Sequence, residues 1–216
     1  MEAKYTNFRT AGYIRPCEKY VGAKVNIDDG FVVSWDAPVV PSVSLAGIPL
    51  ETSAQRLREV LLRSAVDDGL SVFQFDRGPR LRLESYSLDE YGNGGYAFFL
   101  LDRDIINKSK ALIPALSIMI REYKVYALKI YDFSFPGERC RDYIYRGKLP
   151  QAIGLGDRVA VLSQFTKLEF DEAEGWFYTD VDYGGLEVTG LGVPLEDYPD
   201  QKINALCVIS KSPCCD

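Results

Sequence analysis

The apolar residues of this chain recur in short runs that glycine-, proline- and aspartate-rich turns interrupt, and this spacing most restricts the fold. Alternating runs of about four to eight residues suit strands, whereas a helix needs a longer segment with a period near 3.6. The stretch "RLRLESY" alternates cleanly, with Leu81 and Leu83 inward and Arg80 and Arg82 outward. Further strands are predicted at residues 31–35, 70–76, 96–101 and 124–133, and in "WFYT", "LEVTG" and "INALCVI".

The clearest helical pattern is "TSAQRLREVLLRSA", residues 52–65. Thr52 followed by Gln55 fits a capping box, in which two side chains satisfy free amide groups at the start of a helix. An apolar stripe follows, and Gly69 ends the helix. The stripe consists of Ala54, Leu57, Val60, Leu61 and Ala65.

Residues 105–123 fit either a helix or a strand. Pro114 suits the first turn of a helix, but "LSIMI" favours a strand. We favour the helix.

The second half of the chain repeats features of the first in the same order. "AGIPLETS" matches "QAIGLGDR", with Asp157 as a second helix start; "DEYGNGGY" matches "DVDYGGLE"; and "KVYALKI" matches "KINALCV". These matches predict an α+β fold of two helix-plus-antiparallel-meander units, as if duplicated, with a helical insertion in the first. The expected parts are an irregular segment with one strand (1–44), a first unit (45–133), a connector (134–150) and a second unit (151–216).

The second unit contains a strongly acidic and aromatic stretch. Residues 169–200 hold ten carboxylates and neither lysine nor arginine, so they contribute −10, whereas the rest of the chain sums to +4. Such a cluster repels itself, and a basic partner surface would compensate for that cost. The alternative is an ordinary solvated face. The residues predicted to bind a partner are Asp171, Glu172, Glu174, Trp176, Tyr178, Asp180, Asp182, Tyr183 and Glu187.

Composition excludes several classes of function. Histidine is absent, which removes histidine-dependent triads and histidine-ligated metal sites. The net charge of −6 argues against nucleic-acid binding, and no apolar run is long enough to span a membrane. The start lacks the apolar run of a signal peptide and the five cysteines are irregularly spaced, so we expect a cytoplasmic protein with free thiols.

Other candidate sites fail on sequence grounds. Asp180, Asp182 and Gly185 resemble the start of a calcium loop, but Leu191 stands where a bidentate glutamate is required. The glycines of "YGNGGY" lack the lysine of a phosphate-binding loop, so a hairpin turn is the better interpretation. We therefore predict no metal and no cofactor. The cations of the connector, Arg139, Arg141, Arg146 and Lys148, suit an exposed linker or a segment that docks on the acidic stretch.

Two function classes remain: a binding protein, or a small carboxylate-dependent hydrolase such as a glycosidase, which needs a defined pair of acids. "LGDRVAVL", "WFYTDVDYGGLEV" and "INALCVI" resemble immunity proteins of bacterial polymorphic-toxin systems, such as contact-dependent inhibition or type VI secretion. The tandem units are also similar to the β-lactamase inhibitory protein architecture. The resemblance implies a non-enzymatic neutraliser that binds one cognate toxin with a basic surface and blocks its active site.

Overall fold

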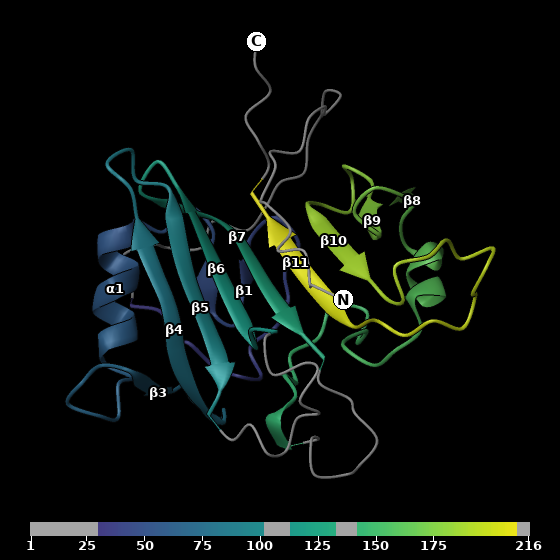
Figure 1. Cartoon of the computed structure of the whole chain (residues 1–216). Helices are drawn as coiled ribbons and strands as arrows, with labels where there is room; N and C mark the ends of the chain where they lie inside the picture. The colour runs from purple at the N-terminus through teal and green to yellow at the C-terminus, as the bar shows by residue number, and fades with distance from the viewer. Residues whose placement is uncertain (1–29, 102–112, 133–141, 211–216) are drawn as a thin grey trace, which may run out of the picture.

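The computed structural model describes residues 30–101, 113–132 and 142–210, and most of these residues build one nine-stranded antiparallel sheet (Figure 1). The strand order is β3-β4-β5-β6-β7-β11-β10-β9-β8. The strands are β3 (Val72–Gln74), β4 (Arg80–Leu88), β5 (Gly94–Leu100), β6 (Leu116–Arg121), β7 (Lys124–Tyr131), β8 (Leu168–Asp171), β9 (Trp176–Thr179), β10 (Leu186–Thr189) and β11 (Ala205–Ile209). In this part of the chain, no helix has the length and apolar character needed to cross a membrane.

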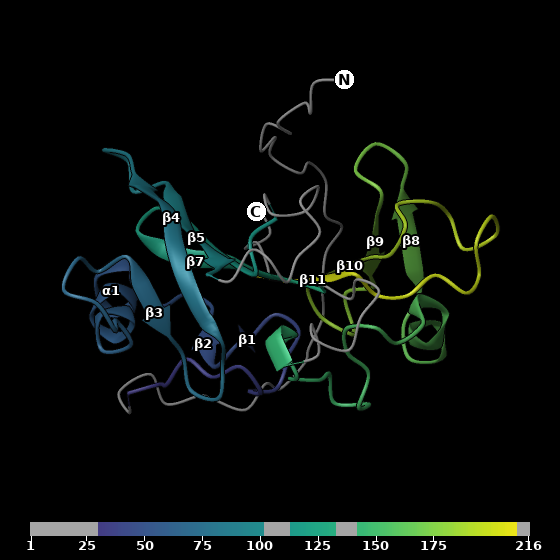
Figure 2. The same cartoon turned by 60° about the horizontal axis from the view of Figure 1, so that its bottom comes forward.

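The sheet consists of two meanders joined through their last strands. β3 to β7 form one meander and β8 to β11 the other, and β7 pairs antiparallel with β11. The two arms slope toward this seam, so one face of the sheet is concave in the end-on view of Figure 2. The fold is therefore mixed but dominated by antiparallel sheet.

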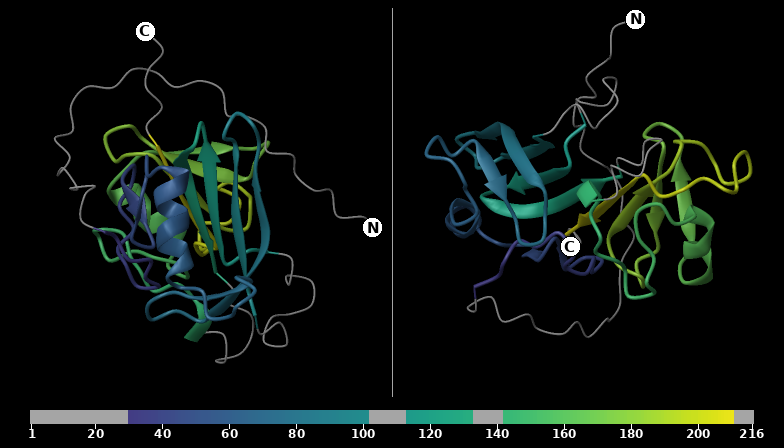
Figure 3. Two further views of the ribbon diagram at one scale, coloured as in Figure 1. Left: turned by 90° about the vertical axis from the view of Figure 1, so that its left-hand side faces the viewer. Right: turned by 90° about the horizontal axis from the view of Figure 1, so that it is seen from below.

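The convex face of the sheet carries the core. It is covered by α1 (Ala54–Leu62), by the small hairpin of β1 (Ser44–Leu45) and β2 (Ile48–Pro49), and by the 3-10 helix η4 (Val159–Gln164) (Figures 2 and 3). Alternation along the strands sends one set of side chains to this face, and the core cluster includes Phe98, Ile118, Leu128, Leu206 and Val188. We call the concave side, which these elements leave uncovered, the open face.

The predicted helix is confirmed as α1, but its N-cap differs from the prediction, and it ends at Leu62 with Arg63 as the C-cap rather than at Gly69. Ser53 is the N-cap, and its hydroxyl accepts a hydrogen bond from the Arg56 amide at 3.2 Å. The Thr52 hydroxyl instead donates to the Pro49 carbonyl at 2.7 Å and is 4% exposed. Either hydroxyl could cap on sequence grounds, and the turn that leads into α1 determines which one does.

The predicted helix over 105–123 is wrong for its last part, since Leu116–Arg121 form strand β6 between β5 and β7. Its burial alternates along the strand, as expected for "LSIMIR" with one face on the core. Residues 102–112 lie outside the described part of the chain.

Three other predicted elements also differ. Residues 31–35 form no strand; Ser34 makes only an isolated parallel bridge with Asp76. The second helix is the short η4, and its N-cap is Arg158, not Asp157, whose carboxylate accepts from the Gly154 amide. Leu168–Asp171, which are not among the predicted strands, form the edge strand β8.

The connector is not an exposed linker where the structure describes it. Tyr145 and Leu149 are each 2% exposed, and Tyr145 contacts the Trp35 ring edge-on with centroids 5.6 Å apart. Its cations bind locally rather than on the acidic stretch: Arg146 donates to the Arg77 carbonyl, and Lys148 forms an ion pair with Asp157. Arg139 and Arg141 lie outside the described residues.

Candidate functional site: the open face of the sheet

Strand alternation places part of the acidic-aromatic stretch on the open face. Glu187 of β10 lies opposite Tyr178 of β9, whereas Val188 lies opposite Phe177 on the core side. Trp176 is two residues from Tyr178 and therefore shares its face. Leu186 and Val188, which alternate with Glu187 along β10, are 1% and 0% exposed and face the core.

The turn between β8 and β9 adds carboxylates at one end of this face. Asp171 shapes the turn, because its Oδ1 accepts from the Ala173 and Glu174 amides at 2.8 and 3.2 Å. Glu172 and Glu174 are exposed. The Tyr178 hydroxyl donates to Glu174 Oε2 at 3.2 Å. Burial, Glu187 and Glu174 together raise the pKa of Tyr178, so this phenol stays a hydrogen-bond donor.

Asp180, Asp182 and Tyr183 lie in the turn at the other end of β9, roughly 13 Å along the strand from the β8–β9 turn. Asp180 accepts from the Lys167 and Tyr183 amides, each at 2.9 Å. Burial opposes its ionisation, but these hydrogen bonds prevail and lower the pKa of Asp180. Its carboxylate thus stabilises a turn.

Tyr183 is directed away from the open face. Its ring packs against the core, and its hydroxyl donates to Gln151 Oε1 at 2.8 Å. Burial raises the pKa of Tyr183 to about 12. The structure therefore gathers Glu174, Trp176, Tyr178 and Glu187 on one face, and it separates them from Asp180, Asp182 and Tyr183.

Sequence reasoning missed the cation at the centre of this face. Lys129 of β7 places its Nζ 4.1 Å from the centroid of the Trp176 ring and 5.9 Å from that of Tyr131. The alternation of "ALKIY" indicates that Lys129 and Tyr131 share a face, but it does not reveal which strands lie beside them. A second lysine outside the stretch, Lys167, pairs with Glu169 at 2.7 Å, and both side chains are largely exposed.

Glu187 is the least solvated acid of the group. Burial raises the pKa of Glu187; attraction by Lys129 and a hydrogen bond with Cys207 partly offset this effect, and the charge on Glu174 adds to it. Cys207 is a free, buried cysteine, and burial and Glu187 raise the pKa of its thiol. A thiol held in its neutral form is a poor nucleophile, so Cys207 supports packing rather than covalent chemistry.

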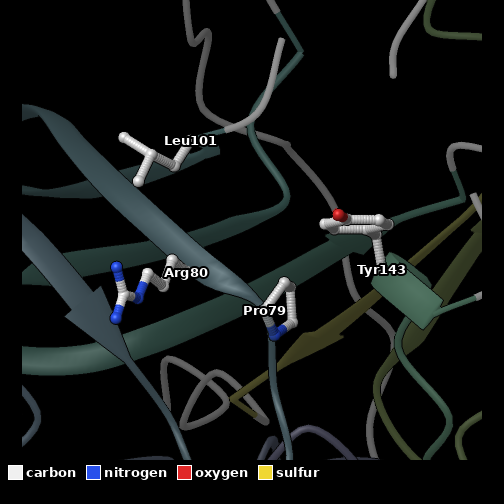
Figure 4. A pocket seen from close by; sticks show the side chains of 4 residues that line it. All are labelled: Pro79, Arg80, Leu101 and Tyr143. Atoms are coloured by element: carbon white, nitrogen blue, oxygen red, sulfur yellow. The ribbon is translucent and has the colours of Figure 1, made fainter. Parts of the chain in front are cut away.

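The other end of the sheet is basic. Arg80 and Arg82 of β4 are exposed on the strand positions that alternate with buried Leu81. A hollow of about 520 Å³ is lined there by Pro79, Arg80, Leu101 and Tyr143 (Figure 4). Among the described residues, this lining contributes one cation, Arg80, and neither a carboxylate nor a thiol.

The arrangement suits recognition of a charged surface more than bond cleavage. Among the described residues, no group of three histidine, cysteine, aspartate or glutamate side chains could hold a metal ion. Aromatic rings such as those of the open face recur at the centres of protein interfaces, and carboxylates complement the charge of a basic partner surface. Comparison of the chain with protein-family models, with curated proteins and with solved structures gave no match.

Proposed function

We propose that this chain is a cytoplasmic immunity protein that neutralises one cognate bacterial toxin by binding it through the open face. The observation that carries the proposal is the grouping of Glu174, Trp176, Tyr178 and Glu187 on a concave surface whose reverse side is covered by the core elements. Aromatic side chains supply contact area there, and the acids attract a basic surface around an active site. The resemblance of the second unit to immunity proteins narrows this binding role to toxin inhibition.

We also propose that the two meanders descend from one duplicated unit. The matched stretches "KVYALKI" and "KINALCV" fall on β7 and on β11 with the residues before it, which are neighbours in the sheet. Their pairing is reciprocal: Leu128 lies opposite Val208, and Ile130 lies opposite Leu206. Two copies related by a two-fold axis would pair in this way.

A carboxylate-dependent hydrolase is the second candidate, and one observation favours it. Burial raises the pKa of Glu187, and Glu174 is exposed nearby, so the face holds two acids in different environments, as acid–base catalysis requires. However, Lys129 favours the ionised form of Glu187, which works against a role as general acid. Loss of turnover in Glu187→Gln without loss of protein binding would identify the enzyme.

The toxin proposal is tested by survival. The chain is co-expressed with candidate toxin domains taken from the genes that flank its own, and growth is compared with that of cells carrying Glu172→Lys/Glu174→Lys. Both acids are exposed, and within the described part of the chain neither accepts a backbone hydrogen bond, so their reversal keeps the hydrogen bonds by which Asp171 and Asp180 stabilise the turns. We expect the native chain to protect the cells and the reversed variant to lose protection. The rate at which the native chain associates with the toxin should fall as the salt concentration rises.

The matched control is Glu196→Lys/Asp197→Lys, which makes the same change in net charge on exposed residues of a different loop. This control should protect as well as the native chain. Full protection by a folded Glu172→Lys/Glu174→Lys variant would show that the acidic end of the open face is not the binding surface.

A further inference from the structure

The side chains of Lys129 and Trp176 meet across two intervening strands. Lys129 is on β7 and Trp176 on β9, with β11 and β10 between them. On the open face, the β11 positions in this gap are the small residues Ala205 and Cys207, which lie opposite Tyr131 and Lys129. Ala205 is 0% and Cys207 2% exposed. The small residues thus form the floor of a site whose walls are rings.

The group in this site is a cation. The Lys129 ammonium lies 4.1 Å from the centroid of the Trp176 ring, with the Tyr131 ring on another side at 5.9 Å. Glu187 is near enough to be affected by its charge. An indole face, a phenol ring and a carboxylate together recognise ammonium and guanidinium groups.

Lys129 has no carboxylate within 4 Å among the described residues. Its ammonium interacts with the Trp176 ring, with the ring and hydroxyl of Tyr131 and, at longer range, with Glu187. The lysine side chain has four flexible bonds and can turn toward solvent without a change in the backbone. A competing cation therefore displaces only one side chain.

We propose that Trp176, Tyr131 and Glu187 form a subsite for one lysine or arginine side chain of the partner, and that Lys129 occupies this subsite in the unbound chain. This inference rests on the proposed binding function, since it names the group that the open face recognises. It also explains how a desolvated carboxylate, Glu187, is kept near a positive charge before the partner arrives. On binding, the partner's cation replaces the Lys129 ammonium over the Trp176 ring, and Lys129 moves into solvent.

The experiment uses small cations in place of the partner. Nα-acetyl-arginine amide, Nα-acetyl-lysine amide and the uncharged Nα-acetyl-norleucine amide are titrated into the native chain and into Lys129→Ala, and tryptophan fluorescence is recorded. The chain has two tryptophans, and Trp35 is 1% exposed, so a saturable change reports on Trp176. We expect Lys129→Ala to bind both cations about tenfold more tightly than the native chain. If Lys129 occupies the subsite about nine-tenths of the time, only about one-tenth of native molecules can bind an added cation, and the substitution removes this competition.

Two variants control for fold and chemistry. Lys129→Arg keeps a cation over the ring and should bind as weakly as the native chain. Lys124→Ala removes an exposed lysine from the same strand and should also leave binding unchanged. Adding Glu187→Gln to Lys129→Ala should remove the preference for cations over norleucine amide.

The results separate this subsite from the function on which it rests. Equal binding by the native chain and a folded Lys129→Ala, or equal binding of norleucine amide, would overturn the subsite even if the chain protects cells from the toxin. Tight cation binding by Lys129→Ala, together with failure of the native chain to protect cells from the toxin, would support the subsite and contradict the immunity function.

Discussion

At the scale of single residues, Glu187 connects the two meanders, because it lies on β10 opposite Tyr178 and is close enough to Lys129 of β7 for the lysine charge to favour its ionised form. Alternation in "LEVTG" separates Leu186 and Val188 from Glu187 and Thr189, and the first pair lies on the core. The nearby charge of Lys129 could not be predicted from the sequence, because the pairing of β7 with β11 brings this lysine close to Glu187. A stretch without any lysine or arginine is therefore next to a cation in the folded protein.

Compared with the native chain, the Glu187→Gln variant should gain stability as pH rises. Because burial raises the pKa of Glu187 above its ordinary value of 4.5, the folded chain binds this proton more tightly than the unfolded chain. The stability from protonation is thus fully present below pH 4.5 and is lost as pH rises through the folded-state pKa. Urea unfolding at about pH 4 and about pH 7 measures the free-energy difference between variant and native chain.

The control for this titration is Glu172→Gln, which removes an exposed carboxylate from the same face. It measures how the exchange of a carboxylate for an amide on this face affects the free energy of unfolding, apart from the burial of Glu187. If the free energy of unfolding of Glu187→Gln instead fell relative to that of the native chain at the higher pH, attraction by Lys129 would outweigh the desolvation of Glu187.

At the scale of elements, the predictions succeeded where alternation and turn signals agreed. β4, β7, β9 and β10 are examples, since each has one apolar face and a turn at its end. The predictions failed where contacts between distant segments determine the local structure. "FVVSW" has the composition of a strand, yet its extended chain lies beneath the sheet, and the Trp35 indole donates to the Tyr143 carbonyl. "LSIMIR" is a strand because it pairs on both sides, with β5 and β7.

The connector offers a direct test of this tertiary control. The buried Tyr145 hydroxyl donates to the Ala37 carbonyl and accepts from the Ala46 amide at 3.0 Å. Tyr145→Phe leaves both backbone groups without that partner, so the free energy of unfolding should fall by about 1–3 kcal/mol. Urea unfolding of the variant and the native chain measures this fall in the free energy of unfolding. Tyr91→Phe is the control, because Tyr91 is 69% exposed and its change should stay within about 0.5 kcal/mol.

At the scale of the whole molecule, the seam between β7 and β11 determines whether the two predicted units are independent. Leu206 and Val208 of β11 lie opposite Ile130 and Leu128, and all four belong to one core cluster. That cluster also includes Trp35 from the first half and Phe177 from the second. Nothing in the local sequence of either unit indicates this continuity, because it arises from pairing between strands far apart in the chain.

The two tryptophans allow the halves to be followed separately. Trp176→Phe leaves only Trp35 as a reporter, and Trp35→Phe leaves only Trp176. Because the sheet and core are continuous, tryptophan fluorescence and far-UV circular dichroism should give the same urea midpoint within each variant. Leu206→Ala, which opens a cavity at the seam, should lower the stability reported by either tryptophan by the same amount, about 2–5 kcal/mol. If Trp176 instead lost its signal at a lower urea concentration than the dichroism, the β8–β11 meander would be a separate folding unit, and the seam an interface between two domains.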